Sequence, residues 1–170
     1  AREGQFAVMR TGALRRFGGI AMNITLEIES IDIPVRKLNG RVQNDRGLWT
    51  YAAEKWYELY KQYVPFREGV LYNTVSITPK QIEHTAPYAH YQYTGVVYGP
   101  NVPIREHGRI VGWYSPVSPK HATDRELKHY RGQHLKAAKE WDKAAEPTQG
   151  PKLVGQIQAY IDAGRLNLNG

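Results

Sequence analysis

Histidines and carboxylates in the C-terminal third are the residues of this sequence that could do chemistry. His129 and His134 follow shortly after Asp124 and Glu126. These side-chain types ligate metals and act as general acids and bases in hydrolysis. In a basic stretch, however, the same residue types more often form a solvated helix face. A hydrolase that uses either histidine is therefore kept as an alternative, and it predicts activity that a single His→Ala change abolishes.

No other pattern in the sequence indicates catalysis. Glu83 and His84 would point to opposite faces of a strand, and none of the six histidines has a metal-ligand spacing such as H-E-x-x-H. The chain has no cysteine, so disulfides, thiolate metal sites and thiol nucleophiles are excluded. Signatures of hydrolases, phosphate-binding loops, dinucleotide sites, zinc fingers and RNA-binding motifs are also absent. We therefore expect a protein that is not an enzyme and has no catalytic residues, no cofactor and no metal. The other histidines are His90, His107 and His121.

Length and composition are those of one globular domain. The chain has 170 residues, of which 41% are hydrophobic and 11% aromatic, enough to bury a sizeable core. The longest apolar runs are far shorter than the roughly 18 residues that a membrane span requires, and no signal-peptide pattern opens the chain. We expect a soluble protein with no membrane partner.

Residues 1–21 form a basic leader or arm that has two interpretations. Four arginines stand here against Glu3, and Met22 directly precedes an alternation of apolar residues that begins at Ile24. In the first interpretation Met22 is the natural start, and the leader is translated from a ribosome-binding site. In the second, the leader is an ordered arm that docks on a partner. We assign residues 22–164 to a single domain and residues 165–170 to a C-terminal tail.

Hydrophobic periodicity predicts a small antiparallel sheet and a long aromatic helix. Residues 23–29 alternate as a strand, and residues 69–77 form a hairpin with a return strand through His84. The helix lies between these strands and ends before Pro65. A short helix follows Pro87 and stops at Gly95. The apolar face of the long helix contains Trp49, Ala52, Ala53, Trp56, Tyr60 and Tyr63.

Residues 99–120 are predicted to form a long, stiffened loop, because four prolines and three glycines interrupt them. A hairpin around Ile110 to Tyr114 is the regular feature that this stretch could contain. Loops of such length are usually functional or disordered, and the apolar residues embedded here favour an interaction surface. The candidate contacts with a partner or neighbouring subunit are Tyr98, Ile104, Ile110, Val111, Trp113 and Tyr114.

The C-terminal part is predicted to be helical. Thr123 and Glu126 fit a capping box, which predicts a short helix from Asp124 and an insertion over residues 99–132. A second helical pattern runs over residues 135–145 and breaks at Pro147. An amphipathic helix then spans residues 151–164 and packs on the sheet. The expected fold is α+β, with the aromatic helix and the C-terminal helix packed on a small antiparallel sheet.

The formal charge of +7 is divided between the leader and residues 120–143, and neither cluster resembles a base-reading motif. The positive side chains would line a lumen through which DNA passes or pair with acidic subunits. A nucleic-acid-binding module is a further alternative, which predicts duplex binding that falls steeply with salt. The candidate basic contacts are Arg125, Lys128, Arg131, Lys136 and Lys139.

Several short motifs occur in an order that resembles a known family. Tyr63-Val64-Pro65 precedes Gly69-Val70-Leu71, residues 85–95 read TAPYAHYQYTG, and GWYSP and WDK follow at residues 112–116 and 141–143. In this order they resemble the minor capsid proteins of long-tailed phages of Gram-positive bacteria, which are similar to tail-completion, or head–tail joining, proteins. The resemblance spans about residues 23–161. The insertion between residues 99 and 133 and the leader depart from it.

The resemblance implies a structural virion protein and identifies no catalytic residue. Such a protein is assembled in the host cytoplasm and forms a homo-oligomeric ring, hexameric by family resemblance, in the neck of the virion. Its partners would be the head-connector or stopper protein on one side and the tail terminator or tail-tube protein on the other, with non-specific contact to DNA in the lumen. A place in the tail-terminator layer is the alternative within the same assembly.

Overall fold

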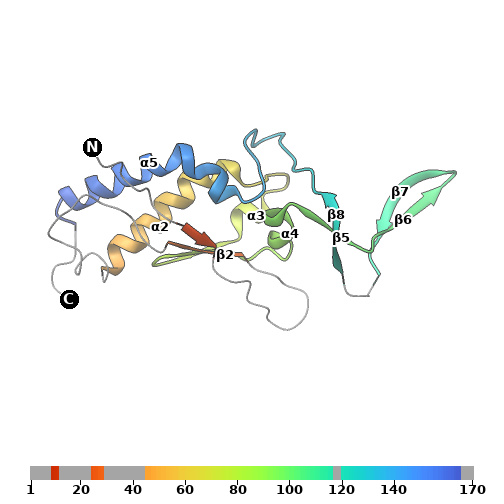
Figure 1. Ribbon diagram of the computed structural model, residues 1–170, viewed down its shortest axis with the longest axis horizontal. Helices are drawn as coiled ribbons and strands as arrows, with labels where there is room; N and C mark the ends of the chain where they lie inside the picture. Colours follow the sequence, from red (N-terminus) through yellow and green to blue (C-terminus); the bar gives the residue numbers. More distant parts are fainter. Residues whose placement is uncertain (1–8, 12–23, 29–44, 117–119, 166–170) are drawn as a thin grey trace.

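The protein has an α+β fold in which two long helices lie along a four-stranded antiparallel sheet (Figure 1). This computed structural model describes residues 9–11, 24–28, 45–116 and 120–165. Two further pairs of strands extend from one end of this body, so that the molecule is elongated. The predicted fold class is confirmed.

The sheet has the strand order β1-β2-β4-β3, and all neighbours are antiparallel. Ile24, Leu26 and Ile28 are buried at every second position, which is the pattern of a strand with one face on the core. The strand predicted at residues 23–29 and the hairpin that turns at residues 79–80 are confirmed. The strands are β1 (Met9–Thr11), β2 (Ile24–Ile28), β3 (Val75–Thr78) and β4 (Gln81–His84).

Of the basic leader, β1 is the part that the structure describes, and it pairs with β2 as an edge strand of the sheet. The rest of residues 1–21, and the choice between the two interpretations of them, lies outside the described residues. The C-terminal tail predicted at residues 165–170 is described only at Arg165.

Residues 70–73 are helical, which corrects the first half of the predicted strand. α3 (Val70–Asn73) follows Gly69, whose φ of 82° lies in the left-handed region that glycine tolerates. Thr74 N donates to Val70 O at 2.9 Å. The helical turn buries Leu71 and leaves Val70 exposed. Because residues 70–73 are helical, the extended segment begins only at Val75.

The aromatic helix is present where the periodicity predicts it. α2 (Arg46–Tyr60) is capped by Asp45, whose side chain accepts from Leu48 N at 2.9 Å, and it continues into a 3₁₀ turn, η1 (Lys61–Tyr63), before Pro65. Six aromatic or alanine positions of the predicted apolar face are buried, so this face is core. They are Trp49, Ala52, Ala53, Trp56, Tyr60 and Tyr63.

The C-terminal helix is longer than predicted. α5 (Trp141–Asp162) passes through Pro147 and Pro151, so the predicted break at Pro147 is wrong. Each proline removes one helix hydrogen bond. Burial against α2 offsets this loss, with Leu153 and Ile157 fully buried and the Tyr51 and Tyr160 rings stacked at 4.5 Å. Packing therefore outweighs the local preference.

The helix predicted from Leu135 begins only at Trp141. Leu135 is 81% exposed, and residues 127–140 form an irregular segment. Glu140, with φ of 44°, precedes the helix, and its backbone N donates to Tyr93 O at 2.8 Å. This contact fixes the start of α5 to α4 (Ala89–Thr94), the short helix that is confirmed after Pro87 and that ends at Gly95.

A buried histidine lies where the sheet meets the helices. His84 is completely buried, with Nε2 2.9 Å from Tyr60 Oη and Nδ1 3.4 Å from Leu71 O. The carbonyl can only accept, so Nδ1 carries a proton; in the neutral ring Nε2 is then an acceptor, and Tyr60 donates to it. Burial disfavours the charged ring and lowers the pKa of His84 to about 4.

We predict that stability falls as the pH is lowered because of His84. Its pKa is about 4 in the folded chain and 6.5 as the ordinary value, so the unfolded chain binds the proton first. The neutral His84 ring contributes about 3 kcal/mol to the free energy of unfolding. This contribution is complete above pH 6.5 and is lost as the pH falls toward 4. Urea unfolding at several pH values, compared with His84→Gln, measures this slope. An equal slope in both proteins would contradict the assignment to His84.

We predict opposite effects of alanine at two glycines. Gly95 has φ of 67°, and a Cβ there would lie 2.9 Å from Lys139 Cβ, so Gly95→Ala should destabilise by about 1–2 kcal/mol. Gly155 lies in α5 with nothing within 4 Å, so Gly155→Ala should stabilise by roughly 0.5–1 kcal/mol. Thermal unfolding of both variants measures the difference. A neutral Gly95→Ala would show that the turn relaxes without cost.

Candidate interaction surface

Two strand pairs carry the chain away from the body. β5 (Val96–Gly99) pairs with β8 (His121–Glu126), and these strands form the stalk. Beyond it, β6 (Val102–Glu106) pairs with β7 (Arg109–Tyr114). We call residues 102–114 the projecting hairpin, because it extends beyond the rest of the molecule (Figure 1). A hairpin is therefore present where the sequence allowed one around residues 110–114. Its first strand, β6, lies in the part that was predicted to be loop.

The short helix predicted from Asp124 is wrong, because this residue lies in β8. Thr123 Oγ1 donates to Val97 O across the stalk at 2.6 Å. The hydroxyl is thus used between strands, although Arg125 N still donates weakly to it at 3.3 Å. A capping-box sequence does not decide the structure when a pairing strand is available.

The turn of the projecting hairpin requires two residues with positive φ. His107 and Gly108 have φ of 48° and 78°, and they connect the paired residues Glu106 and Arg109. A two-residue turn of this kind matches the twist of the flanking strands. Local turn chemistry therefore specifies the hairpin without contacts to the body.

The projecting hairpin carries apolar side chains on both of its faces. Val102 opposes Tyr114 and Ile104 opposes Gly112, while Trp113 opposes Pro103 on the other face. The register shifts between Ile104 and Arg105, where β7 contains one extra residue. The exposed apolar side chains are Val102 (49%), Ile104 (46%), Ile110 (47%), Val111 (56%), Trp113 (57%) and Tyr114 (55%).

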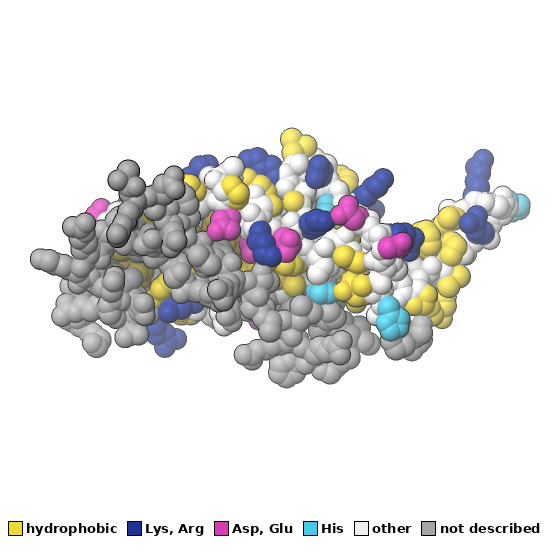
Figure 2. Space-filling view, in the orientation of Figure 1, with side chains coloured by type: hydrophobic (Ala, Val, Ile, Leu, Met, Phe, Trp, Pro, Cys, Tyr) yellow, Lys and Arg dark blue, Asp and Glu magenta, His cyan; other side chains and the backbone are white. Residues whose placement is uncertain are grey.

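A two-stranded ribbon cannot bury either face by itself, and an isolated hairpin is marginally stable in water. Figure 2 shows hydrophobic side chains along the projecting hairpin, with basic ones toward its tip. An exposed apolar surface of this kind, rimmed by polar residues, is typical of a protein interface. The arrangement can therefore bind another protein surface.

The structure brings five of the six predicted contact residues together and separates Tyr98 from them. Tyr98 lies in the stalk, where its hydroxyl is 3.0 Å from His90 Nε2 and its ring is 4.7 Å from that of Tyr91. It therefore fixes the stalk to α4. Val102 was missed by the sequence reasoning, although its alternation with Ile104 was a usable strand signal.

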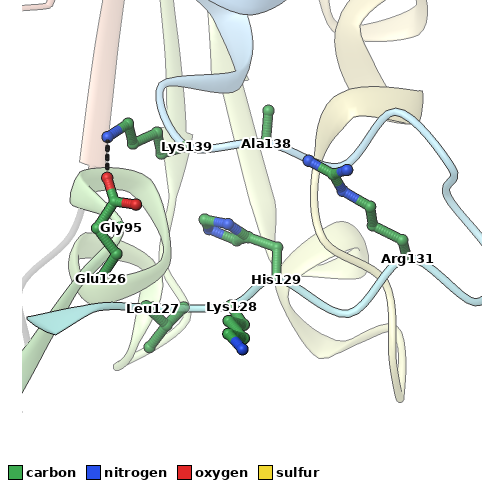
Figure 3. Close-up of a pocket in the computed structure, with 8 residues that line it drawn as sticks. All are labelled: Gly95, Glu126, Leu127, Lys128, His129, Arg131, Ala138 and Lys139. Carbon is green, nitrogen blue, oxygen red and sulfur yellow. Dashed lines mark hydrogen bonds and ion pairs between the residues drawn. The ribbon is translucent and has the colours of Figure 1, made fainter.

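The predicted basic contacts do not form one surface. Lys128, Arg131 and Lys139 line a pocket of about 410 Å³ between residues 126–131 and 138–139 (Figure 3). Arg125 lies exposed in β8, and Lys136 Nζ lies 5.4 Å from the centre of the Tyr63 ring.

Within this pocket the three cations do not converge on a common point. Lys139 Nζ pairs with Glu126 Oε1 at 2.8 Å, and this contact raises the pKa of Lys139 and lowers that of Glu126. Arg131 Nε donates to Ala137 O at 3.1 Å, and Lys128 points away from Lys139 (Figure 3). The pocket therefore lacks the arrangement that would hold a phosphate group.

The two histidines considered for hydrolysis anchor the chain instead. His129 Nε2 lies 2.7 Å from Gln92 O and His134 Nδ1 lies 2.7 Å from Val64 O, so each donates a proton to a backbone carbonyl. Asp124 lies exposed in β8, and Glu126 pairs with Lys139. Within residues 9–11, 24–28, 45–116 and 120–165, no group of three or more histidines and carboxylates could hold a metal ion.

Comparisons with known protein families, with curated proteins and with solved structures find no match to this chain. In the described part of the chain, no helix has the length and hydrophobicity to cross a membrane. The function must therefore be inferred from the geometry of the chain and the order of its motifs.

We predict that the projecting hairpin contributes little to the stability of the free protein. Trp113 is 57% exposed, so Trp113→Ser should change the free energy of unfolding by less than about 0.5 kcal/mol. For comparison, even the milder change Trp141→Phe, at a residue with no exposure, should cost roughly 2 kcal/mol. Urea unfolding compares the two. A large loss from Trp113→Ser would mean that the side chain packs on the body.

Proposed function

We propose that this protein is a structural subunit of a phage neck, which forms a ring that joins the DNA-filled head connector to the tail. The observation that carries this proposal is the projecting hairpin, with six exposed apolar side chains on two faces. A ring subunit needs a rigid core and a segment that reaches its neighbours. The body and the projecting hairpin have these two properties.

Residues from several of the motifs that carry the family resemblance belong to one packing unit, whereas Trp113 and Tyr114 of the GWYSP motif lie exposed in the projecting hairpin. Tyr63, Val64, Tyr93 and Trp141 are buried, although they lie far apart in the sequence. Tyr93 Oη donates to Asp142 Oδ1 at 2.8 Å, which joins two of the motifs directly. This contact supports the proposal, because residues of two motifs that are distant in the sequence interact in the same core.

Three of the five candidate basic residues already interact within the chain, whereas Arg125 and Lys128 are exposed. Lys139, Arg131 and Lys136 each interact with a group of their own chain. Phosphate contacts require cations that are free to neutralise the backbone of the nucleic acid. The described geometry therefore supports a joining role through the projecting hairpin more than the nucleic-acid-binding alternative.

Imaging of particles from a phage with an amber stop in this gene tests the proposal. We expect filled heads beside separate tails of normal length. Overlong tails would instead assign the protein to the tail-terminator layer. Intact infectious virions would overturn the neck function and leave the nucleic-acid-binding alternative.

We further predict the outcome of complementation in the amber background. The wild-type protein should restore joined particles. Trp113→Ser should give no more joined particles than the uncomplemented amber mutant, because the most exposed large apolar side chain of the projecting hairpin is lost. Lys152→Ser, an exposed change on α5, is the matched control and should restore them. Full rescue by Trp113→Ser would contradict the role of the hairpin and not the neck assignment.

A further inference from the structure

The exposed large hydrophobic side chains of the described residues fall into two sets. Six belong to the projecting hairpin. The other four are Val70 (42%), Tyr88 (39%), Tyr130 (50%) and Leu135 (81%), and they belong to the body. Single exposed hydrophobic residues are common, but two of the second set, Tyr88 and Tyr130, line one hollow.

The hollow is a pocket of about 320 Å³ beside α3. Its lining includes Pro65, Leu71, Tyr88 and Tyr130, together with Arg67, Glu68 and Lys128. A pocket of this volume is at the lower limit of sites that hold small ligands, and one or two side chains could fill it.

The remaining two exposed residues are connected to the lining of this pocket through their neighbours in the chain. Val70 stands between Gly69 and Leu71, which both line it. Leu135 follows His134, whose ring packs 5.1 Å from that of Phe66. We call Val70, Tyr88, Tyr130 and Leu135, with the pocket beside them, the acceptor surface.

We propose that the projecting hairpin of one copy docks on the acceptor surface of the next copy. This inference rests on the proposed ring-forming function and names the contact that would build the ring. A contact between two different patches of the same chain is heterologous, and repeating it closes a ring when the rotation permits.

The size of the hairpin surface fits such a contact. Its six half-exposed apolar side chains present on the order of 500 Å² to solvent, against the ~800 Å² that each partner buries in a standard interface. Polar residues of the hairpin and its stalk can supply the remainder as a rim.

Each surface carries both basic and acidic side chains, which can form opposite-charge pairs across the contact. The hairpin carries Arg105, Glu106 and Arg109, while the acceptor surface carries Arg67, Glu68 and Lys128. Glu68 can pair with an arginine of the hairpin, and Glu106 can pair with Arg67 or Lys128. Rim pairs of this kind select the orientation of a partner more than they add affinity.

Pairing of two hairpins with each other explains less of the structure. Such a contact would be isologous and would close at two copies. It would also leave Tyr88, Tyr130 and Leu135 exposed around an empty pocket. The heterologous contact covers both sets of exposed hydrophobic residues at once.

Disulfide trapping tests this contact cleanly, because the chain has no cysteine. Arg105→Cys and Lys128→Cys, on chains with tags of different size, are mixed at millimolar concentration and oxidised. We expect a cross-linked pair that contains one chain of each kind. Adding Trp113→Ser to the first chain should lower its yield about tenfold, because the central anchor is removed. A mixture of Arg105→Cys with Lys152→Cys is the matched control.

Two outcomes would overturn the proposal. Efficient cross-linking of Arg105→Cys chains with each other would show hairpin-to-hairpin pairing. A mixed yield no higher than that of the Lys152→Cys control would show that the acceptor surface is not the partner. Neither outcome bears on the imaging of amber particles, so failure of this contact and failure of the neck function are distinguishable.

Discussion

The buried junction around Trp141 determines how the projecting segment leaves the body. The Trp141 ring packs 5.0 Å from His84 and 4.9 Å from Tyr93, so that β4, α4 and α5 meet at one side chain. Tyr93 also binds the first turn of α5 through Asp142, and its carbonyl accepts from Glu140 N. Because the stalk begins directly after α4, the direction of the projecting hairpin depends on this junction. A rigid core thus controls the position of a surface that lies outside it.

The projecting hairpin can drive association only weakly by itself. Burial of on the order of 500 Å² of apolar surface would contribute roughly 12 kcal/mol as an upper bound. The loss of translational and rotational freedom on association costs ~4–15 kcal/mol. These quantities are of similar size, so one contact is marginal. In a closed ring each subunit makes two such contacts, and closure of the last one is intramolecular. Closure of the proposed ring would therefore supply stability that a single pair lacks.

Local sequence signals predicted the elements whose structure is decided locally. The aromatic stripe of α2, the alternation of β2, the β3–β4 turn and the Gly95 stop of α4 are all of this kind. The errors lie where distant contacts decide. α5 crosses Pro147 because its buried face packs on α2, and Thr123 joins a strand because Val97 O accepts its hydroxyl proton. Neither partner can be identified from the sequence near these residues.

The candidate site was predictable in its composition but not in its geometry. Apolar residues in a stretch rich in proline and glycine indicated an interaction surface, and the hairpin carries them. The cations could not be assigned in this way, since a lysine in the sequence does not reveal whether it has a partner. Lys139 binds Glu126 and Arg131 binds Ala137 O, and both contacts fasten residues 127–140 to the body. The same segment supplies Tyr130 and Leu135 to the acceptor surface. These internal contacts of Lys139 and Arg131 therefore hold in place the apolar residues on which the proposed contact between copies depends.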